Sequence, residues 1–375
     1  MDEQGHDDHR TTVTIAPPAA ATSYEVRVRP GLLDQAGRLI AASCSADRYA
    51  VIADTQVANL YGERVLEALA GADLDAMLLR FPAGEWNKSR ESWSELSDRM
   101  LKAGFGPDAA VVALGGGVAG DLAGFVAATL MGGVPLIRIP TTLLAMLDCS
   151  VGGRTGVDTP AGKNRVGAVH QPSLVLTDPT VLGTLPAPQF AAGLAAAIKH
   201  GLILDAAYFE TLAGELDEVF ARRPEVLTRL ISRSVEIKAE VVSRDARENG
   251  YSAVLDFGHS VAGAQEAIAG YAWLHGEALA AGMALEAAIG EAAGVTRAGV
   301  SRRVSEVLEA AGLPVALDDD VDAERFFQAL EGGGKQEAGG IRCTLLDDIG
   351  RLAGSAEKGW SQVVPVDLVR AVLFG

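Results

Sequence analysis

Five short apolar runs, separated by segments of helical character, dominate the first half of the chain and constrain its fold more than any other feature. They lie at residues 24–28, 48–53, 76–80, 109–114 and 134–139, and their lengths and residue types are typical of strands. Helical stretches such as residues 93–103 lie between them. This alternation predicts an α/β domain with a mostly parallel sheet flanked by helices.

The character of the chain changes after Pro186. Long segments rich in Ala, Leu and Glu follow, interrupted at Gly250, Gly270 and the glycine run at 332–334, where helices are expected to end. Residues 1–22, by contrast, are polar and then rich in Pro and Ala, without apolar periodicity. We therefore expect a disordered tail at 1–22, an α/β domain at 23–185 and a mainly α-helical domain at 186–375.

The acidic balance of the chain limits its partners. The formal net charge is −17, whereas proteins that bind nucleic acid present basic faces to phosphates, so nucleic acid is excluded. The sequence has no apolar stretch of ~18 residues that could span a membrane and no signal-peptide core. Cys44, Cys149 and Cys343 fit neither a disulfide framework nor a cysteine zinc site. We expect a cytoplasmic protein that does not bind membranes and that binds an anionic substrate through a local basic cluster.

A glycine-rich turn follows the fourth apolar run. Residues 109–125 are typical of a buried strand, then Gly115–Gly117, and then a helix that begins near Asp121. Glycines let backbone N–H groups approach a phosphate, and the helix N-terminus adds a favourable dipole. Such turns also occur without a ligand, and Asp121 alone could complement the helix dipole. Asp54, after a strand, and Glu85 favour a nucleotide site, because such carboxylates commonly bind ribose hydroxyls.

Four ordered motifs between residues 115 and 167 carry a resemblance to a known family. They are Gly115-Gly-Gly-Val-Ala-Gly-Asp121, Ile139-Pro-Thr-Thr-Leu-Leu-Ala-Met-Leu-Asp148, Ser150-Val-Gly-Gly-Arg-Thr-Gly156 and Gly162-Lys-Asn-Arg-Val-Gly167. Matching segments continue to Leu274-His-Gly-Glu277 and Lys335. Together they resemble dehydroquinate synthase and related sugar phosphate cyclases. The resemblance implies a Rossmann-like N-terminal domain, a helical C-terminal domain, NAD bound in a cleft and a homodimer.

The resemblance also implies the reaction class of a carbon–oxygen lyase. A hydroxyl of a phosphorylated sugar or sugar acid is oxidised by NAD+, which acidifies the neighbouring C–H, and phosphate is then eliminated. The ketone is reduced again, and an intramolecular aldol reaction closes the ring. A divalent metal, zinc or cobalt, would polarise the hydroxyl being oxidised.

The matched motifs assign roles to individual residues. The cofactor is expected to be lined by Asp54, Glu85, Lys88, Gly115, Gly116, Gly117, Asp121, Thr141, Thr142, Lys163 and Thr184. The catalytic and substrate-facing residues are expected to be Asp148, Arg154, Asn164, Lys199, Lys238 and Lys335. His259 and His275 match the family's two histidine metal ligands. Without the motifs, most of these would be interpreted as turn, cap or solvated surface residues.

One departure from the family pattern concerns the metal. Ala196 occupies the position of the family's third ligand, a glutamate, and two histidines alone make a weak metal site. Three alternatives follow: a site of reduced affinity, a shell completed by another oxygen such as that of Asp256, or a protein that works without metal.

Other departures concern the substrate. Asp256 stands where the family has Asn, Gly263 where it has a second His, Ser252 and Gly132 where it has arginines, and Arg154 where it has lysine. A planar guanidinium is not equivalent to an ammonium point charge. The changes at 256 and 263 also occur in the family's cyclases that act on sedoheptulose 7-phosphate.

Three functions are therefore compared. The first is a divergent cyclase acting on a heptulosonate 7-phosphate or, in secondary metabolism, on sedoheptulose 7-phosphate. The second is a polyol dehydrogenase of the related metal-dependent fold, which would release NADH. The third is a non-catalytic NAD-binding homologue, motivated by Ala196.

Overall fold

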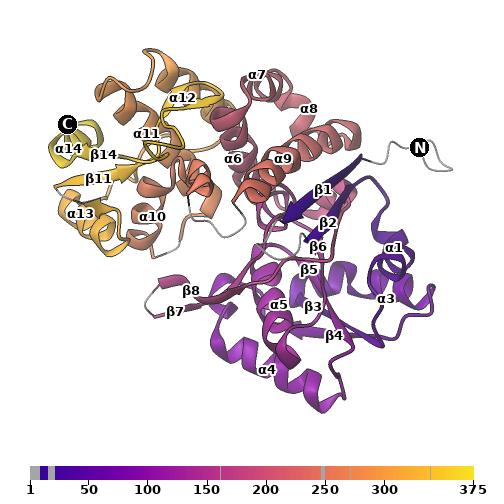
Figure 1. Ribbon diagram of the computed structural model, residues 1–375. Coiled ribbons are helices and arrows are strands. Elements are labelled where there is room, and N and C mark those ends of the chain that lie inside the picture. The colour runs from indigo at the N-terminus through magenta and orange to yellow at the C-terminus, as the bar shows by residue number, and fades with distance from the viewer. Residues whose placement is uncertain (1–8, 16–21, 161, 246–249, 271, 338) are drawn as a thin grey trace. The chain divides into compact units, whose positions relative to one another are not determined.

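The structure is a computed structural model, and it describes residues 9–15, 22–160, 162–245, 250–270, 272–337 and 339–375. The chain divides into two compact units (Figure 1). The first comprises Met1–Leu185 and Pro224–Ala246, and the second comprises Pro186–Arg223 and Arg247–Gly375.

A seven-stranded sheet is the framework of the first unit, in the order β1-β2-β9-β6-β5-β3-β4. Its strands are β1 (His9–Ile15), β2 (Thr22–Val28), β3 (Arg48–Asp54), β4 (Ala76–Phe81), β5 (Ala109–Gly115), β6 (Leu136–Pro140) and β9 (Leu174–Thr177). All neighbours are parallel except β1 and β2, which are antiparallel. The predicted mostly parallel sheet is confirmed.

Helices cover this sheet on both faces. They are α1 (Ala36–Ser43), α2 (Thr55–Val57), α3 (Glu63–Ala70), α4 (Arg90–Lys102), α5 (Gly117–Thr129) and α9 (Pro224–Arg244), with short 3-10 or π-helical turns at Leu33–Gln35, Ala58–Gly62, Glu85–Asn87, Leu130–Gly132, Ala145–Cys149 and Pro179–Thr184. On one face, Leu96 of α4 and Leu122 of α5 share a core cluster with Ile52 of β3. All seven residues of β5 are buried, as expected of a central strand covered on both sides.

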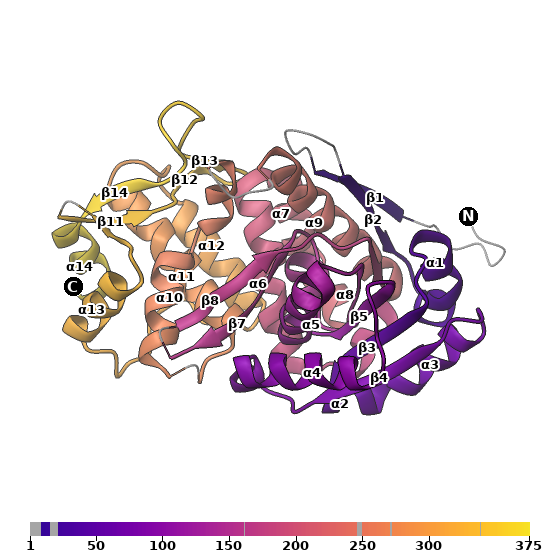
Figure 2. The same cartoon turned by 60° about the horizontal axis from the view of Figure 1, so that its bottom comes forward.

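A β-hairpin that the sequence pattern did not predict lies beside α5. Its strands, β7 (Arg154–Thr159) and β8 (Gly162–Val169), pair antiparallel and form a sheet of their own (Figure 2). Val157 belongs to the same core cluster as α4 and α5. The hairpin therefore places the Gly162–Gly167 motif beside the N-terminal sheet.

Two of the expected boundaries need correction. The expected disordered tail contains β1, whose Val13 is fully buried, because pairing with β2 stabilises a segment that has no apolar run of its own. Residues 1–8 and 16–21 of the tail lie outside the described residues. Helix α9, expected in the second domain, belongs to the first unit, where it packs against β1 and β2.

The second unit is mainly helical. Its helices are α6 (Ala187–Leu204), α7 (Ala206–Gly214), α8 (Leu216–Phe220), α10 (His259–Ile268), α11 (His275–Ala292), α12 (Val300–Ala310), α13 (Ala323–Gly332) and α14 (Val366–Phe374), with a 3-10 turn at Tyr251–Asp256. Short strands form two small sheets: β10 (Gln336–Glu337), β11 (Gly340–Cys343) and β14 (Gln362–Pro365), and β12 (Leu346–Asp348) with β13 (Arg351–Leu352). No helix among the described residues is long and apolar enough to cross a membrane.

Candidate functional site

The strand order of the first unit changes direction between β3 and β5. From β3 the chain continues outward to β4 and then returns to β5 on the other side, and parallel sheets bind ligands at such points, beyond the carboxyl ends of the strands. Asp54 ends β3, where its carboxylate accepts hydrogen bonds from the backbone N–H groups of Gln56 (2.8 Å) and Val57 (3.0 Å). A Cβ atom on Gly115, which ends β5, would lie 3.7 Å from Asp54 Oδ2. Two residues predicted to line the cofactor thus lie together at the switch point.

The glycine turn after β5 admits no side chain at its tightest positions. Gly115 has a φ of +151°, and a Cβ atom there would lie 2.6 Å from Cβ of Ala119. A Cβ atom on Gly116 would lie 3.0 Å from Cγ2 of Thr142, and the N–H of Thr141 donates to the Gly115 carbonyl at 2.9 Å. Helix α5 starts at Gly117 without a side-chain cap, so its first N–H groups suit an anionic ligand.

A buried lysine joins three carboxylates near this turn. The ammonium of Lys88, only 4% exposed, lies 3.1 Å from Glu85 Oε1, 3.4 Å from Asp121 Oδ2 and 3.4 Å from Asp158 Oδ1. It also donates a hydrogen bond to Asn164 Oδ1 at 2.9 Å. Four residues predicted from the motifs therefore form one cluster, to which Asp158 is an addition that the sequence did not single out.

The charges of this cluster are mutually dependent. Burial opposes the charged form of Lys88, but Asp121, Glu85 and Asp158 outweigh it and raise the pKa of the ammonium. Burial raises the pKa of Asp121, and Lys88 opposes that rise. Lys163 adds a second cation, with Nζ 3.9 Å from Glu85 Oε1. Lys88 is therefore a permanent cation at neutral pH, held in place by its acidic neighbours.

Asp148 and Lys238 form a second pair in the same unit. Asp148 lies in the π-helical turn Ala145–Cys149, and Lys238 extends from α9. Lys238 Nζ donates to the Asp148 backbone carbonyl at 2.5 Å and forms an ion pair with its carboxylate. The side chains are only 12% and 19% exposed, so the expected cost of a buried aspartate is offset by a partner 90 residues away in sequence.

Thr184 and Arg154 have different surroundings. The Thr184 hydroxyl lies 2.6 Å from the hydroxyl of Tyr61, which also donates to the Val181 carbonyl at 2.8 Å. Tyr61, buried at 7% exposure, was not predicted, since nothing in its local sequence distinguishes it. The side chain of Arg154, at the start of β7, is exposed.

The two predicted metal ligands lie together in the second unit. His259 begins α10, His275 begins α11, and their ring centroids are 5.7 Å apart. Nδ1 of His275 lies 3.0 Å from Oε1 of the buried Glu266. A carboxylate in this position typically fixes the ring orientation of a metal-binding histidine.

The donor set nevertheless falls short of a metal centre of the family type. Ala196 is fully buried in α6, and this helix approaches α11 closely, because a Cβ atom on Gly276 would lie 1.8 Å from the Ala192 carbonyl oxygen. Ala192 and Ala196 lie four residues apart and therefore share a helix face, and the side chain at position 196 is a methyl group that cannot bind a metal. No group of three or more His, Cys, Asp or Glu side chains in the described part of the chain could hold a metal ion. These residues do not fit a three-ligand catalytic site.

Within the described part of the chain, Asp256 forms no three-member donor group with the two histidines. Its Oδ2 lies 3.5 Å from Nζ of Lys335, so this carboxylate partly neutralises one of the predicted substrate cations. Lys199, a further predicted cation, is buried in α6 at 1% exposure.

A second buried carboxylate, Glu286, was not predicted from the sequence. It is fully buried in α11 and accepts hydrogen bonds from the backbone N–H groups of Gly258 (2.9 Å), Ser260 (2.9 Å) and Val261 (3.2 Å). It thus caps the start of α10, the helix that carries His259. Burial raises the pKa of Glu286 to about 7, although the three backbone hydrogen bonds act to lower it. In the sequence, only its position within an Ala-rich helical segment could have indicated that this glutamate is buried.

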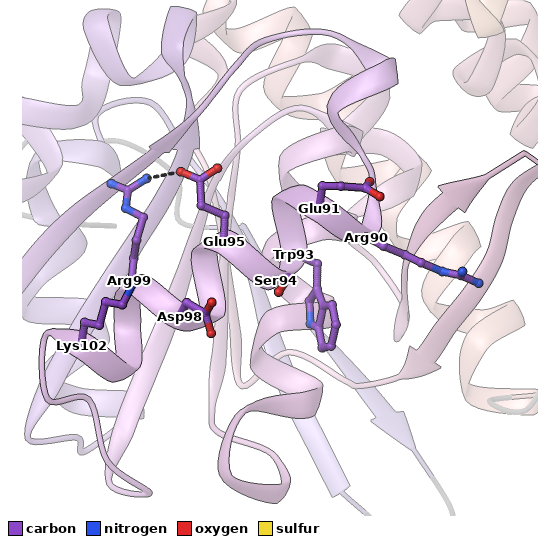
Figure 3. A pocket seen from close by; sticks show the side chains of 8 residues that line it. All are labelled: Arg90, Glu91, Trp93, Ser94, Glu95, Asp98, Arg99 and Lys102. Atoms are coloured by element: carbon purple, nitrogen blue, oxygen red, sulfur yellow. Dashed lines mark ion pairs between the residues drawn. The ribbon is translucent and has the colours of Figure 1, made fainter.

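A pocket on α4 stands apart from these residues (Figure 3). It is lined by Arg90, Glu91, Trp93, Ser94, Glu95, Asp98, Arg99 and Lys102, and Arg99 pairs with Glu95 at 3.8 Å. None of the predicted site residues lines it. Its exposed residues Asp98 and Lys102 are therefore suitable positions for control substitutions.

Comparisons with known structures identify the fold. A crystal structure of 2-deoxy-scyllo-inosose synthase with carbaglucose-6-phosphate, NAD+ and Co2+ matches with a TM-score of 0.88 at 25% identity, covering 97% of this chain and 99% of that one. The 2-epi-5-epi-valiolone synthase of Streptomyces hygroscopicus, with NAD+ and Zn2+ bound, matches with a TM-score of 0.85 at 33% identity over 96% and 98%. An iron-containing alcohol dehydrogenase shares the fold alone, with a TM-score of 0.68 at 15% identity over 93% of this chain and 96% of that one.

Sequence comparisons give the family. The family models described as 3-dehydroquinate synthase N-terminal and C-terminal match residues 78–192 and 193–336. A 3-dehydroquinate synthase of Symbiobacterium thermophilum is 43% identical over 86% of this chain and 90% of its own length. That of Nostoc punctiforme is 39% identical over 94% and 96%. The predicted resemblance is thereby confirmed: the chain belongs to the 3-dehydroquinate synthase family, whose members are carbon–oxygen lyases that cyclise sugar phosphates.

Proposed function

We propose that this protein is an NAD-dependent sugar phosphate cyclase that eliminates phosphate from a heptulose or heptulosonate 7-phosphate. Its curated relatives are 3-dehydroquinate synthases, and two solved relatives of the same fold carry NAD+. The observation that carries the proposal is the cluster around Lys88, because it joins Glu85 and Asp121, which we assign to the cofactor, to Asn164, which we assign to the substrate.

The switch point of the sheet supplies the features that a dinucleotide needs. Asp54 lies where a carboxylate can accept hydrogen bonds from ribose hydroxyls, and the uncapped start of α5 offers N–H groups to a pyrophosphate. Lys88 and Lys163 lie in the same cluster, where Glu85, Asp121 and Asp158 balance their charges. Bound NAD+ would supply a reversible hydride acceptor.

The Asp148–Lys238 pair is suited to proton management. Its polar atoms are largely withdrawn from water, so the ammonium of Lys238 can hold a proton close to an oxygen on which negative charge develops. Asp148 keeps that ammonium oriented. We assign these two residues to the acid–base part of the reaction.

The metal half of the site is weaker than in the family pattern. Because Ala196 leaves two imidazoles and no third ligand, we propose that divalent ions bind with low affinity, and no catalytic step is assigned to a metal. Glu266 would hold His275 in the orientation that metal binding requires.

The Asp256–Lys335 pair favours a substrate without a carboxylate. A lysine already paired with an acid attracts a second carboxylate less, and Ser252 offers no positive charge. We therefore propose sedoheptulose 7-phosphate, in preference to the heptulosonate 7-phosphate, as the substrate. Separately, the family resemblance leads us to propose a homodimer.

The test compares 3-deoxy-arabino-heptulosonate 7-phosphate with sedoheptulose 7-phosphate in the presence of NAD+. A cyclase releases phosphate without net formation of NADH, and we expect faster release from sedoheptulose 7-phosphate. Accumulation of NADH, followed by the absorbance of the reduced nicotinamide, would support the polyol dehydrogenase instead.

A further inference from the structure

We infer that Asp158 is a positioning residue that orients both Lys88 and Asn164 and thereby couples cofactor binding to substrate binding. The inference rests on the proposed function, in which Lys88 faces the cofactor and Asn164 the substrate. It concerns a residue to which neither the matched motifs nor the comparisons assign a role.

Asp158 lies at an irregularity of the β7–β8 hairpin. Val157 pairs with Val166 and Thr159 pairs with Gly162, so the register shifts between these two pairs. An irregularity of this kind changes the direction of a side chain relative to the regular ladder. Here it directs Asp158 toward Lys88, which lies outside the hairpin.

Asp158 contacts Lys88 through both its backbone and its side chain. Its N–H donates to the Lys88 carbonyl at 2.7 Å, and its Oδ1 lies 3.4 Å from the Lys88 ammonium. The Asp158 side chain is 19% exposed and that of Lys88 only 4%, so the ion pair is largely shielded from water. Shielded pairs constrain a side chain more than exposed ones do.

The same carboxylate oxygen also constrains Asn164. It accepts a hydrogen bond from the Asn164 N–H at 2.9 Å, and Asn164 adopts a left-handed conformation with a φ of +55°. That conformation is uncommon for residues other than glycine, and asparagine adopts it mainly where local hydrogen bonds support it. In it, Asn164 Oδ1 accepts from Lys88 Nζ at 2.9 Å, which closes a triangle of three residues.

Asp158 therefore differs from the other acids around Lys88. Glu85 and Asp121 also pair with the ammonium, but Asp158 in addition holds the Asn164 backbone. Removing its carboxylate should therefore affect both ligands, whereas keeping only a neutral hydrogen-bond acceptor should preserve the Asn164 half.

The experiment compares Asp158→Asn with Asp158→Ala. Asparagine keeps an oxygen for the Asn164 N–H but removes the charge beside Lys88, whereas alanine removes both. Asp98→Asn and Asp98→Ala, at an exposed position on α4, are the matched controls. Dissociation constants are measured by calorimetry for NAD+ and for sedoheptulose 7-phosphate in the presence of NADH, which cannot accept a hydride and therefore prevents turnover. Thermal melting verifies folding.

For Asp158→Ala we expect both dissociation constants to rise roughly fivefold, the effect of losing one hydrogen bond of ordinary strength. For Asp158→Asn we expect weaker NAD+ binding with sugar phosphate binding within about twofold of wild type, below that same effect. Unchanged binding of both ligands to Asp158→Ala, or an equal loss in Asp98→Ala, would overturn the inference. If Asp158→Ala does not fold, the split between the two ligands in Asp158→Asn decides.

The design separates this inference from the proposed function. Binding is measured without turnover, so an inactive wild type contradicts the cyclase proposal while the NAD+ arm still tests the role of Asp158. Where the wild type turns over, an increase in KM larger than the decrease in kcat for Asp158→Ala supports positioning of the substrate-facing Asn164.

Discussion

Lys238 contacts Asp148 twice, through the backbone carbonyl at 2.5 Å and through an ion pair with the carboxylate. The two residues come from α9 and from the π-helical turn Ala145–Cys149. Because α9 returns to the first unit after the chain has begun the second, this contact joins distant parts of the sequence within one unit. It brings a cation to a carboxylate that would otherwise be buried at a cost.

Substituting Lys238 by Met is expected to lower the turnover number by about a hundredfold or more, the usual contribution of a general acid or base. When Lys238→Met is added to the Asp148→Asn variant, the turnover number should fall little further, because the two residues act as a unit. A double-mutant cycle on kcat provides the measurement. Additive losses would show that the pair does not act together.

Substituting Lys88 by Met leaves three carboxylates, Glu85, Asp121 and Asp158, without their shared cation. We expect weaker NAD+ binding and a lower melting temperature. The melting deficit should be larger at pH 8 than at pH 5, because burial raises the pKa of Asp121 and loss of the Lys88 charge, which opposes that rise, favours protonation of Asp121 at low pH. Lys102→Met on the exposed surface of α4 is the control, and an equal deficit at both pH values would contradict this explanation.

Substituting Ala196 by Glu should supply the third metal ligand that we propose this site lacks. We expect the affinity for Co2+ to rise by at least about tenfold, since even an outer-shell partner contributes that much. The visible absorption of bound Co2+ provides a readout independent of activity. Ala196→Gln, of similar size but without charge, is the matched control, and an equal gain in both variants would argue against a carboxylate ligand.

Glu286 should make the stability of the protein depend on pH. Its folded pKa of about 7 lies above the ordinary value of 4.5, so the folded state binds the proton more tightly than the unfolded state. The contribution of Glu286 to the free energy of unfolding is therefore fully present below pH 4.5 and is lost as the pH rises through 7. Relative to Glu286→Gln, the wild type should lose unfolding free energy between pH 5 and pH 7.5, as measured by urea denaturation. A constant difference would contradict the raised pKa.

The sequence predicted what depends on local pattern. The strands around Ile52 and Val112 were recognisable because consecutive buried residues leave a continuous apolar run. The β7–β8 hairpin was missed because no residue of its strand β8 is buried, so that this strand has no apolar run in the sequence. The support that we propose it gives Asn164 depends on a tertiary contact with Lys88, which the local sequence does not indicate.

The site shows the same division. The motifs singled out Lys88, Asp121 and Asn164, and the structure brings these three side chains together. Glu286 and Tyr61 were missed because their hydrogen-bond partners lie far away in the sequence, so the local sequence gives no indication of them.

The most direct measurement follows phosphate and NADH together during incubation of the protein with sedoheptulose 7-phosphate and NAD+. A sugar phosphate cyclase releases phosphate continuously while the absorbance of NADH stays flat, because the hydride returns to the substrate in every turnover. NADH that accumulates in step with product, or the absence of phosphate release from both heptulose phosphates, would contradict the cyclase assignment.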